Sequence, residues 1–264
     1  MQEKLIPLLL GRPSDEAIIN PGDYIRLIET VRKRKKPKLP KKALLSFRYT
    51  GALDILKDRY DVETCDFLDV ERPIYIFEHE GIPLCFTYLP VGAPTASMVL
   101  EELMALGVEK AIFFGGVGVL KPEIRRWQIV LPEKAIRDEG TSYHYQEPSM
   151  FAYPSRGLLQ ALEKALKAMG VDYVRGAVWT TDAPYRETRL KRELFMGIGA
   201  ICVDMEAAAL FSVASFRGKE IAALFYAGDL VADIWEPRYE EEHERKRKDI
   251  VELMLSCVIE ALCL

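Results

Sequence analysis

The sequence has 264 residues, of which 49% are hydrophobic, and a formal net charge of −4 at pH 7. A chain of this length buries a large core, as one α/β domain or as a domain with an appendage. The acidic balance argues against a nucleic-acid-binding protein, and no apolar run approaches the length of a membrane span. The N-terminus lacks the basic stretch, apolar core and cleavage site of a secretion signal. We therefore expect a soluble cytoplasmic protein with no nucleic-acid or membrane partner.

The five cysteines are scattered, with no CxxC pair and no neighbouring histidine pattern. Three of them lie in apolar runs, which favours free buried thiols over disulfides or metal ligands. No dinucleotide-binding fingerprint is present either. We therefore expect neither a metal nor an organic cofactor.

The first 41 residues differ from the rest of the chain. A helix is predicted over 23–31, and it is followed by the basic, proline-broken run 32–42. Such a run can bind polyanions, but no aromatic residue interrupts it and the rest of the chain is acidic, which favours a solvated linker. The sequence thus predicts an N-terminal extension with a basic linker at 1–41 and one domain at 42–264.

The domain alternates between short apolar runs typical of strands and amphipathic runs typical of helices. This alternation predicts an α/β fold with a central sheet flanked by helices. Thr95 is expected to cap the second helix of the domain. The predicted strands are 43–47, 60–67, 73–78, 82–89, 111–114, 127–131, 173–180, 200–203 and 220–226. The predicted helices are 51–59, 96–106, 157–169, 187–195, an alanine-rich helix after residue 206, and 240–262.

Two carboxylates stand at a junction between an apolar strand and the alanine-rich helix. They are Asp204 and Glu206, on either side of Met205. Inside an oily segment such groups need partners if they are buried. In the first turn of a helix the dipole favours an anion, and Glu206 could accept hydrogen bonds from ligand hydroxyls. An acidic first turn is also a common way to start a helix, so capping and ligand binding both remain open.

Four predicted strand ends carry glycines or polar groups. They are 115–118, 180–185, 204–206 and 228–229. In an α/β fold the strand ends can converge on one crevice at the edge of the sheet, where ligands bind. We expect the functional site there.

The ordered set of these segments resembles the nucleoside phosphorylase superfamily, in the branch that holds uridine phosphorylases, hexameric purine nucleoside phosphorylases and methylthioadenosine-type nucleosidases. The residues V-D-M-E-A-A-A-L at 203–210 are similar to its E-M-E-(A/S)-A segment. G-A-P-T at 92–95, before E-E-L at 101–103, resembles its G-x-P-(S/T) helix. G-T-S-Y-H at 140–144 resembles G-T-S-x-H, and T-D-A-P-Y at 181–185 resembles S-D-x-F-Y. The resemblance runs from about residue 43 to the terminal helix.

This resemblance implies a single domain with a mixed, partly barrel-like sheet between layers of helices, assembled as a dimer to hexamer. It also implies cleavage of an N-glycosidic bond through an oxocarbenium-like sugar. Glu206 would hold the 2′- and 3′-hydroxyls with Asp204 as support, and Met205 would pack on the sugar. Asp229 matches the aspartate with which purine-cleaving members protonate N7 of the base, and which uridine phosphorylases lack.

By the same resemblance, Tyr185 lines the base pocket, Thr181 or Thr180 lies at its edge, Arg189 reaches a base carbonyl and His144 belongs to the substrate site. Simpler interpretations exist for several of these residues. Met205 and Tyr185 could be packing residues, His144 a surface histidine and Asp229 a turn cap.

The phosphate site departs from the family pattern. Family phosphorylases carry R-x-G-(S/T)-x-G, whereas residues 113–118 read F-F-G-G-V-G, so that Phe113 and Gly116 replace the arginine and the hydroxyl residue. Arg48 is the one nearby cation that could substitute, since a guanidinium suits bidentate phosphate binding. The amides of Gly115 and Gly116 could still form an anion nest.

We predict a pentosyltransferase that cleaves a purine or uridine nucleoside by phosphorolysis, with phosphate as co-substrate and pentose 1-phosphate and free base as products. A hydrolytic nucleosidase and a binding protein without turnover remain alternatives, because Phe113 and Gly116 replace the usual phosphate ligands.

Overall fold

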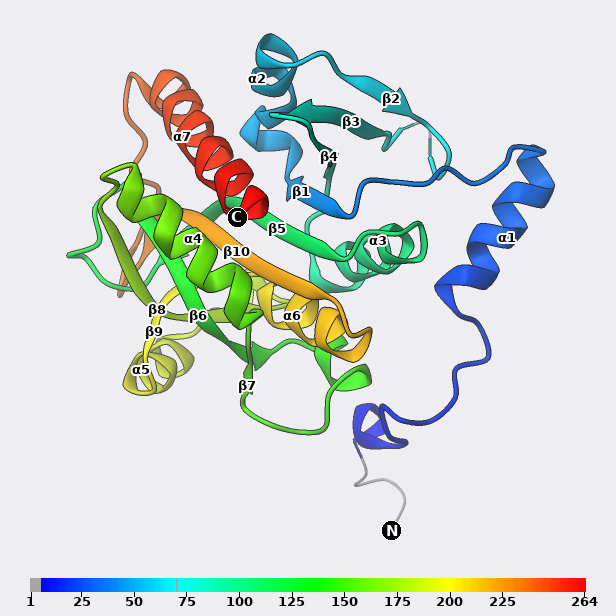
Figure 1. Ribbon diagram of the computed structural model, residues 1–264. Coiled ribbons are helices and arrows are strands. Elements are labelled where there is room, and N and C mark those ends of the chain that lie inside the picture. Colours follow the sequence, from blue (N-terminus) through cyan, green and yellow to red (C-terminus); the bar gives the residue numbers. More distant parts are fainter. Residues whose placement is uncertain (1–5, 70) are drawn as a thin grey trace.

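The computed structural model describes residues 6–69 and 71–264, and its strands form one mixed sheet (Figure 1). The strand order is β11-β10-β6-β8-β9-β5-β1-β4-β3-β2, with β7 beside β6. The strands are β1 (Lys42–Ser46), β2 (Glu63–Cys65), β3 (Ile74–His79), β4 (Ile82–Tyr88), β5 (Lys110–Val119), β6 (Ile129–Asp138), β7 (Phe151–Ala152), β8 (Tyr173–Thr181), β9 (Ala200–Asp204), β10 (Glu220–Val231) and β11 (Trp235–Glu236).

Half of the sheet closes on itself. Strand β5 pairs in parallel with β10 and antiparallel with β9, while β10, β6, β8 and β9 pair in turn, so these strands form a closed ring. Strands β1, β4, β3 and β2 continue from β5 as an open extension. The expected mixed, partly barrel-like sheet is confirmed.

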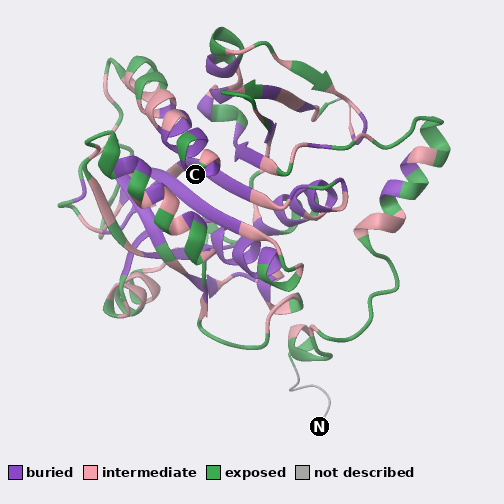
Figure 2. Ribbon diagram, in the orientation of Figure 1, coloured by how far each residue is buried: buried purple, intermediate pink, exposed green. Residues whose placement is uncertain are grey.

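Helices cover both faces of the sheet. The helices are α1 (Pro21–Arg32), α2 (Ala52–Arg59), α3 (Ala93–Ala105), α4 (Arg156–Ala168), α5 (Arg189–Gly197), α6 (Ala207–Phe216) and α7 (His243–Cys263). Helices α2, α4 and α7 share one apolar cluster with the sheet, and α3 and α6 share another, with α1 outside α3. Figure 2 shows long buried stretches along β5, β10 and the α6 helix. This gives the three-layer arrangement that was expected.

The N-terminal extension, described from residue 6, is attached to the domain by specific contacts. Helix α1 begins with a capping box in which Asn20 and Asp23 exchange hydrogen bonds, which satisfies two backbone donors of the first turn. Ile25 and Ile28 are the buried residues of this helix. Arg32, the last residue of this helix, donates hydrogen bonds of 2.9 Å to two backbone carbonyls in the segment between β2 and β3. Part of the basic run therefore lies against the protein surface.

Several boundaries differ from the prediction. Helix α3 begins at Ala93, so Thr95 lies inside its first turn and Gly92 takes the N-cap position. The glycine segment at 115–118 is not a loop, because β5 continues through it to Val119 while paired with β10. Strands β6 and β10 also run further than their apolar residues indicated, because both strands belong to the closed ring.

All five cysteines are free, and Cys85, Cys202 and Cys257 are buried. Within residues 6–69 and 71–264, no helix is both long and apolar enough to cross a membrane.

Candidate active site

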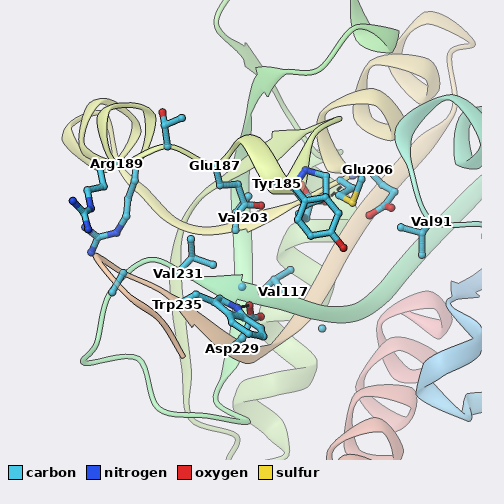
Figure 3. A pocket seen from close by; sticks show the side chains of 18 of the residues that line it. Val91, Val117, Tyr185, Glu187, Arg189, Val203, Glu206, Asp229, Val231 and Trp235 are labelled. Carbon is cyan, nitrogen blue, oxygen red and sulfur yellow. Dashed lines mark hydrogen bonds between the residues drawn. The ribbon is translucent and has the colours of Figure 1, made fainter. Parts of the chain in front are cut away.

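A cavity of about 720 Å³ opens where β5, β10 and the β9–α6 junction meet. Figure 3 shows its lining side chains, with Glu206 and Asp229 well apart along the cavity. Seven of the predicted site residues line it: Gly116, Tyr185, Arg189, Asp204, Met205, Glu206 and Asp229. The strand ends singled out in the sequence therefore do converge on one cavity.

The β9–α6 junction positions two carboxylates at one part of the cavity. Asp204 ends β9, and its Oδ2 accepts hydrogen bonds from the amides of Glu206 (3.2 Å) and Ala207 (2.7 Å). Its Oδ1 accepts from the Thr180 hydroxyl at 2.7 Å. Glu206 is the N-cap residue of α6, and its Oε1 accepts a hydrogen bond of 2.6 Å from the amide of Gly92. Asp204 thus satisfies the helix start, and Glu206 is held from the α3 side.

Both carboxylates are buried, with exposed fractions of 9% for Asp204 and 6% for Glu206. Burial raises the pKa of Glu206, and the neighbouring Asp204 raises it further. Burial also raises the pKa of Asp204, although its hydrogen bonds from Thr180 and two backbone amides oppose the shift. Such a site favours a nearby positive charge or hydroxyl donor, because each stabilises the ionised form of a carboxyl group that burial has desolvated.

A second pair of acidic side chains lies in another part of the cavity. Asp229 lies within the irregularity of β10 between Ala227 and Leu230, and its Oδ2 accepts a hydrogen bond of 2.6 Å from the Trp235 indole. Burial and the charge of Asp229 raise the pKa of Glu187 to about 7. Glu187 can therefore carry a proton near neutral pH, which suits hydrogen bonding to a heteroaromatic ring.

The two cavity arginines are directed to the protein itself. Arg189 donates to the backbone carbonyl of Asp233 at 3.1 Å, and Arg192 lies 3.5 Å from the Asp233 carboxylate. Arg192 also donates to the Leu120 carbonyl at 2.8 Å. Tyr185 is 99% exposed and stands at the rim. These residues form part of the wall of the cavity.

The glycine end of the cavity is packed with aromatic rings. The Gly116 amide donates to the Tyr49 hydroxyl at 3.0 Å. A Cβ at Gly115 would lie 2.8 Å from that hydroxyl oxygen, and one at Gly116 would lie 2.7 Å from the Tyr226 ring. Phe113 is fully buried and packs against two further phenylalanines of the core. The glycines therefore make room for side chains from elsewhere in the chain.

Four predicted residues do not line this cavity. Arg48 donates to the Glu71 carbonyl and lies over the Tyr88 ring, 5.9 Å from its centroid. Gly115 lies behind Tyr49. The buried Thr181 accepts a hydrogen bond from a backbone amide two residues on. His144 lines a different cavity, of about 530 Å³, between the extension and α3.

Other lining residues were not predicted from the sequence, notably Tyr49, Glu187, Arg192 and Trp235. Glu187 lies two residues from both Tyr185 and Arg189, which were predicted to belong to the site. Its position in this segment was the only sign in the sequence that it could line the cavity. Trp235 and Tyr49 reach the cavity through contacts that spacing does not reveal. Across residues 6–69 and 71–264 no group of three or more His, Cys, Asp or Glu side chains could hold a metal ion.

Comparison with known proteins identifies the family. The model of the phosphorylase superfamily matches residues 51–262. The chain is 26% identical over 214 residues to a guanosine phosphorylase of Halorubrum lacusprofundi, covering 80% of this chain and 89% of the relative. It is 24% identical over 216 residues to a DeoD-type purine nucleoside phosphorylase of Mannheimia succiniciproducens, covering 78% and 90%.

A solved structure agrees at the level of the fold. The crystal structure of uridine phosphorylase from Vibrio fischeri has a TM-score of 0.74 and 23% identity, and the alignment covers 86% of this chain and 93% of that one. The family match, the closed sheet and the acidic cavity at the β9–α6 junction agree with one another. This chain therefore belongs to the phosphorylase superfamily, among relatives named as nucleoside phosphorylases.

Proposed function

We propose that this protein cleaves the N-glycosidic bond of a nucleoside whose base is a purine. The observation that supports this most directly is the shared cavity of Glu206 and Asp229, one held at a helix start and the other on β10. A hydroxylated sugar and a flat heteroaromatic base need these two kinds of group at separate places. The cavity volume of about 720 Å³ is ample for both parts.

At the sugar, positive charge develops on the ribose ring as the glycosidic bond lengthens. The buried pair Asp204 and Glu206 is suited to this charge, because a carboxylate in a desolvated site attracts a cation more strongly than in water. Glu206 accepts hydrogen bonds from the ribose hydroxyls, and Asp204 keeps the start of α6 in place. Met205 packs on the sugar between them.

At the base, Asp229 delivers a proton to the departing ring and Glu187 hydrogen-bonds to its edge. General acid assistance of this kind accounts for about 10²–10⁴ in rate. A purine presents a ring nitrogen acceptor to an acid at this position, whereas uracil does not. The names of two relatives, a guanosine phosphorylase and a purine nucleoside phosphorylase, point to the same class of base.

The test is release of free base by the purified protein from guanosine, inosine, adenosine and uridine, followed by chromatography. We expect release from at least one purine nucleoside and much slower release from uridine. Absence of release from all four, in the presence and in the absence of phosphate, would reject the proposed function. Faster release from uridine than from every purine nucleoside would reject the assignment of the base.

A further inference from the structure

We infer that water, and not inorganic phosphate, accepts the pentosyl group, because Tyr49 occupies the part of the cavity in which an anion would meet the glycine amides. This inference depends on the proposed cleavage of a nucleoside, and it departs from the phosphorolysis predicted from the sequence. Three features of the cavity carry it: the contacts of Tyr49, the distribution of charge, and the fit between Tyr49 and the glycines.

The first feature is the hydrogen bonding of Tyr49. Its hydroxyl oxygen accepts the Gly116 amide hydrogen at 3.0 Å, and the hydroxyl lies 3.4 Å from the Gly116 carbonyl, to which it donates. Backbone amides directed at one point are what a bound anion requires. Burial raises the pKa of Tyr49 well above its usual value, so this amide is satisfied by a neutral group.

The second feature is the charge of the lining. Acidic side chains line the cavity at Glu187, Asp204, Glu206 and Asp229. Of its guanidiniums, Arg192 pairs with the Asp233 carboxylate and Arg189 donates to the Asp233 backbone carbonyl. Arg48, which was expected to substitute for the missing phosphate-binding arginine, donates a hydrogen bond to the Glu71 carbonyl. A phosphate dianion placed beside Gly116 would be desolvated among acidic side chains, which is unfavourable without a paired cation.

The third feature shows that Tyr49 is fitted to its position. Its ring stacks on Phe47 with a centroid separation of 5.7 Å and an interplanar angle of 11°. A methyl group on Gly115 would come within 2.8 Å of the Tyr49 hydroxyl and within 2.9 Å of the Phe47 ring. Any other residue at position 115 would displace both rings. The glycines thus receive aromatic side chains rather than an anion.

Water needs none of the groups that a dianion needs. In the proposed step, a water oxygen forms a bond to C1′ while the C1′–N bond breaks and its electron pair passes to the base. The base takes a proton from Asp229, the proton lost by water passes to the solvent, and Asp229 is reprotonated from the solvent. The products are a free pentose and a free base. Because an oxocarbenium-like centre is strongly electrophilic, a neutral nucleophile suffices.

The experiment uses purified full-length protein and the purine nucleoside that it cleaves best. Base release is measured in phosphate-depleted buffer and with added inorganic phosphate, and the sugar product is identified by ³¹P and ¹³C NMR in ¹⁸O-labelled water. We expect the same rate in both buffers, free pentose as the product, and ¹⁸O at C1′. Release that requires phosphate and gives pentose 1-phosphate would overturn the inference and leave the proposed function standing. No release at all would reject both.

A variant tests the role of Tyr49 itself. Tyr49→Ala frees the Gly116 amide and opens the space beside it. We therefore expect added phosphate to raise the rate of base release by this variant by about tenfold, the effect of one charge-assisted hydrogen bond. Tyr153→Ala removes another exposed tyrosine, which lies outside the cavity, and should be as insensitive to phosphate as the wild type. If Tyr49→Ala folds normally, as judged by circular dichroism, and remains insensitive to phosphate, Tyr49 is not what excludes the anion.

Discussion

The indole of Trp235 donates a hydrogen bond of 2.6 Å to the Asp229 carboxylate. Trp235 begins β11, which pairs antiparallel with the end of β10, and its register partner is Val231. The hairpin therefore carries both the proposed acid and the group that orients it. Because 63% of the Trp235 surface is exposed, this orientation depends on one hydrogen bond and the hairpin rather than on a packed core.

Asp229→Asn should lower the rate of purine release by about 10²–10⁴, because it removes the proton donor and keeps the shape of the side chain. The loss should appear in kcat rather than in KM, since the acid acts mainly on the departing base. Steady-state kinetics on the best purine nucleoside measure both. Asp172→Asn is the matched control, because Asp172 pairs with Arg125 on the surface outside the cavity. If the kcat of Asp229→Asn equals that of the wild type within error, Asp229 is not the proton donor and its role is structural.

Trp235→Phe should lower kcat by about tenfold, the effect of one hydrogen bond to a charged group. The phenylalanine ring keeps most of the apolar surface and loses only the N–H donor. In the double variant with Asp229→Asn the two losses should not add, because Trp235 acts through Asp229. Fully additive losses in a double-mutant cycle would show that Trp235 contacts the substrate independently.

Glu187→Gln should change the pH dependence of stability. The raised pKa of Glu187, about 7, means that the folded state holds this proton more tightly than the unfolded chain does. Its contribution to stability is therefore greatest at low pH and is lost as the pH rises towards 7. Glutamine does not titrate, so the Tm of Glu187→Gln relative to the wild type should be higher at pH 8 than at pH 5. An equal difference at both pH values, measured by thermal denaturation, would contradict the shift.

Ile25→Ala tests whether α1 belongs to the folded unit. Ile25 is 2% exposed beside α3, so its truncation should lower the free energy of unfolding by about 2–3 kcal/mol. Leu27→Ala is the control on the same helix. Because Leu27 is 56% exposed, its truncation should change the free energy of unfolding by less than about 0.5 kcal/mol. Chemical denaturation gives both values. Equal, small effects would indicate that α1 unfolds independently of the domain.

The helices and most strands could be predicted because their apolar patterns are local. The seven α-helices of residues 6–69 and 71–264 lie where amphipathic or alanine-rich runs indicated them, and the β9–α6 junction carries its carboxylates as expected. The short strands β7 and β11 were not predicted, since two residues form no pattern. The closed ring itself was implied only by the resemblance, because the β5–β10 pairing joins segments that are far apart in the sequence.

The glycine segment of β5 shows why part of the site was not predictable. Glycines after an apolar strand are typical of a ligand-binding loop, but Gly115 and Gly116 remain in the sheet and accommodate Tyr49, Phe47 and Tyr226. The contact between Gly116 and Tyr49 spans 67 positions of the chain. The spacing of the residues in the two segments does not indicate this contact. Charge alone favours Arg48 over its neighbour Tyr49 as a ligand for an anion.

The most direct test of the central claim is the base-release rate of Glu206→Gln beside the wild type. Glutamine keeps the size of the side chain and removes the charge, so the fold should survive and kcat/KM should fall by about 10- to 100-fold, the effect of a lost charge-assisted hydrogen bond to the sugar. Glu102→Gln removes a carboxylate that is buried to a similar degree, at 4% exposed, but lies outside this cavity, and should leave kcat/KM unchanged. If Glu206→Gln releases base at the wild-type rate, Glu206 does not hold the ribose and the account is wrong.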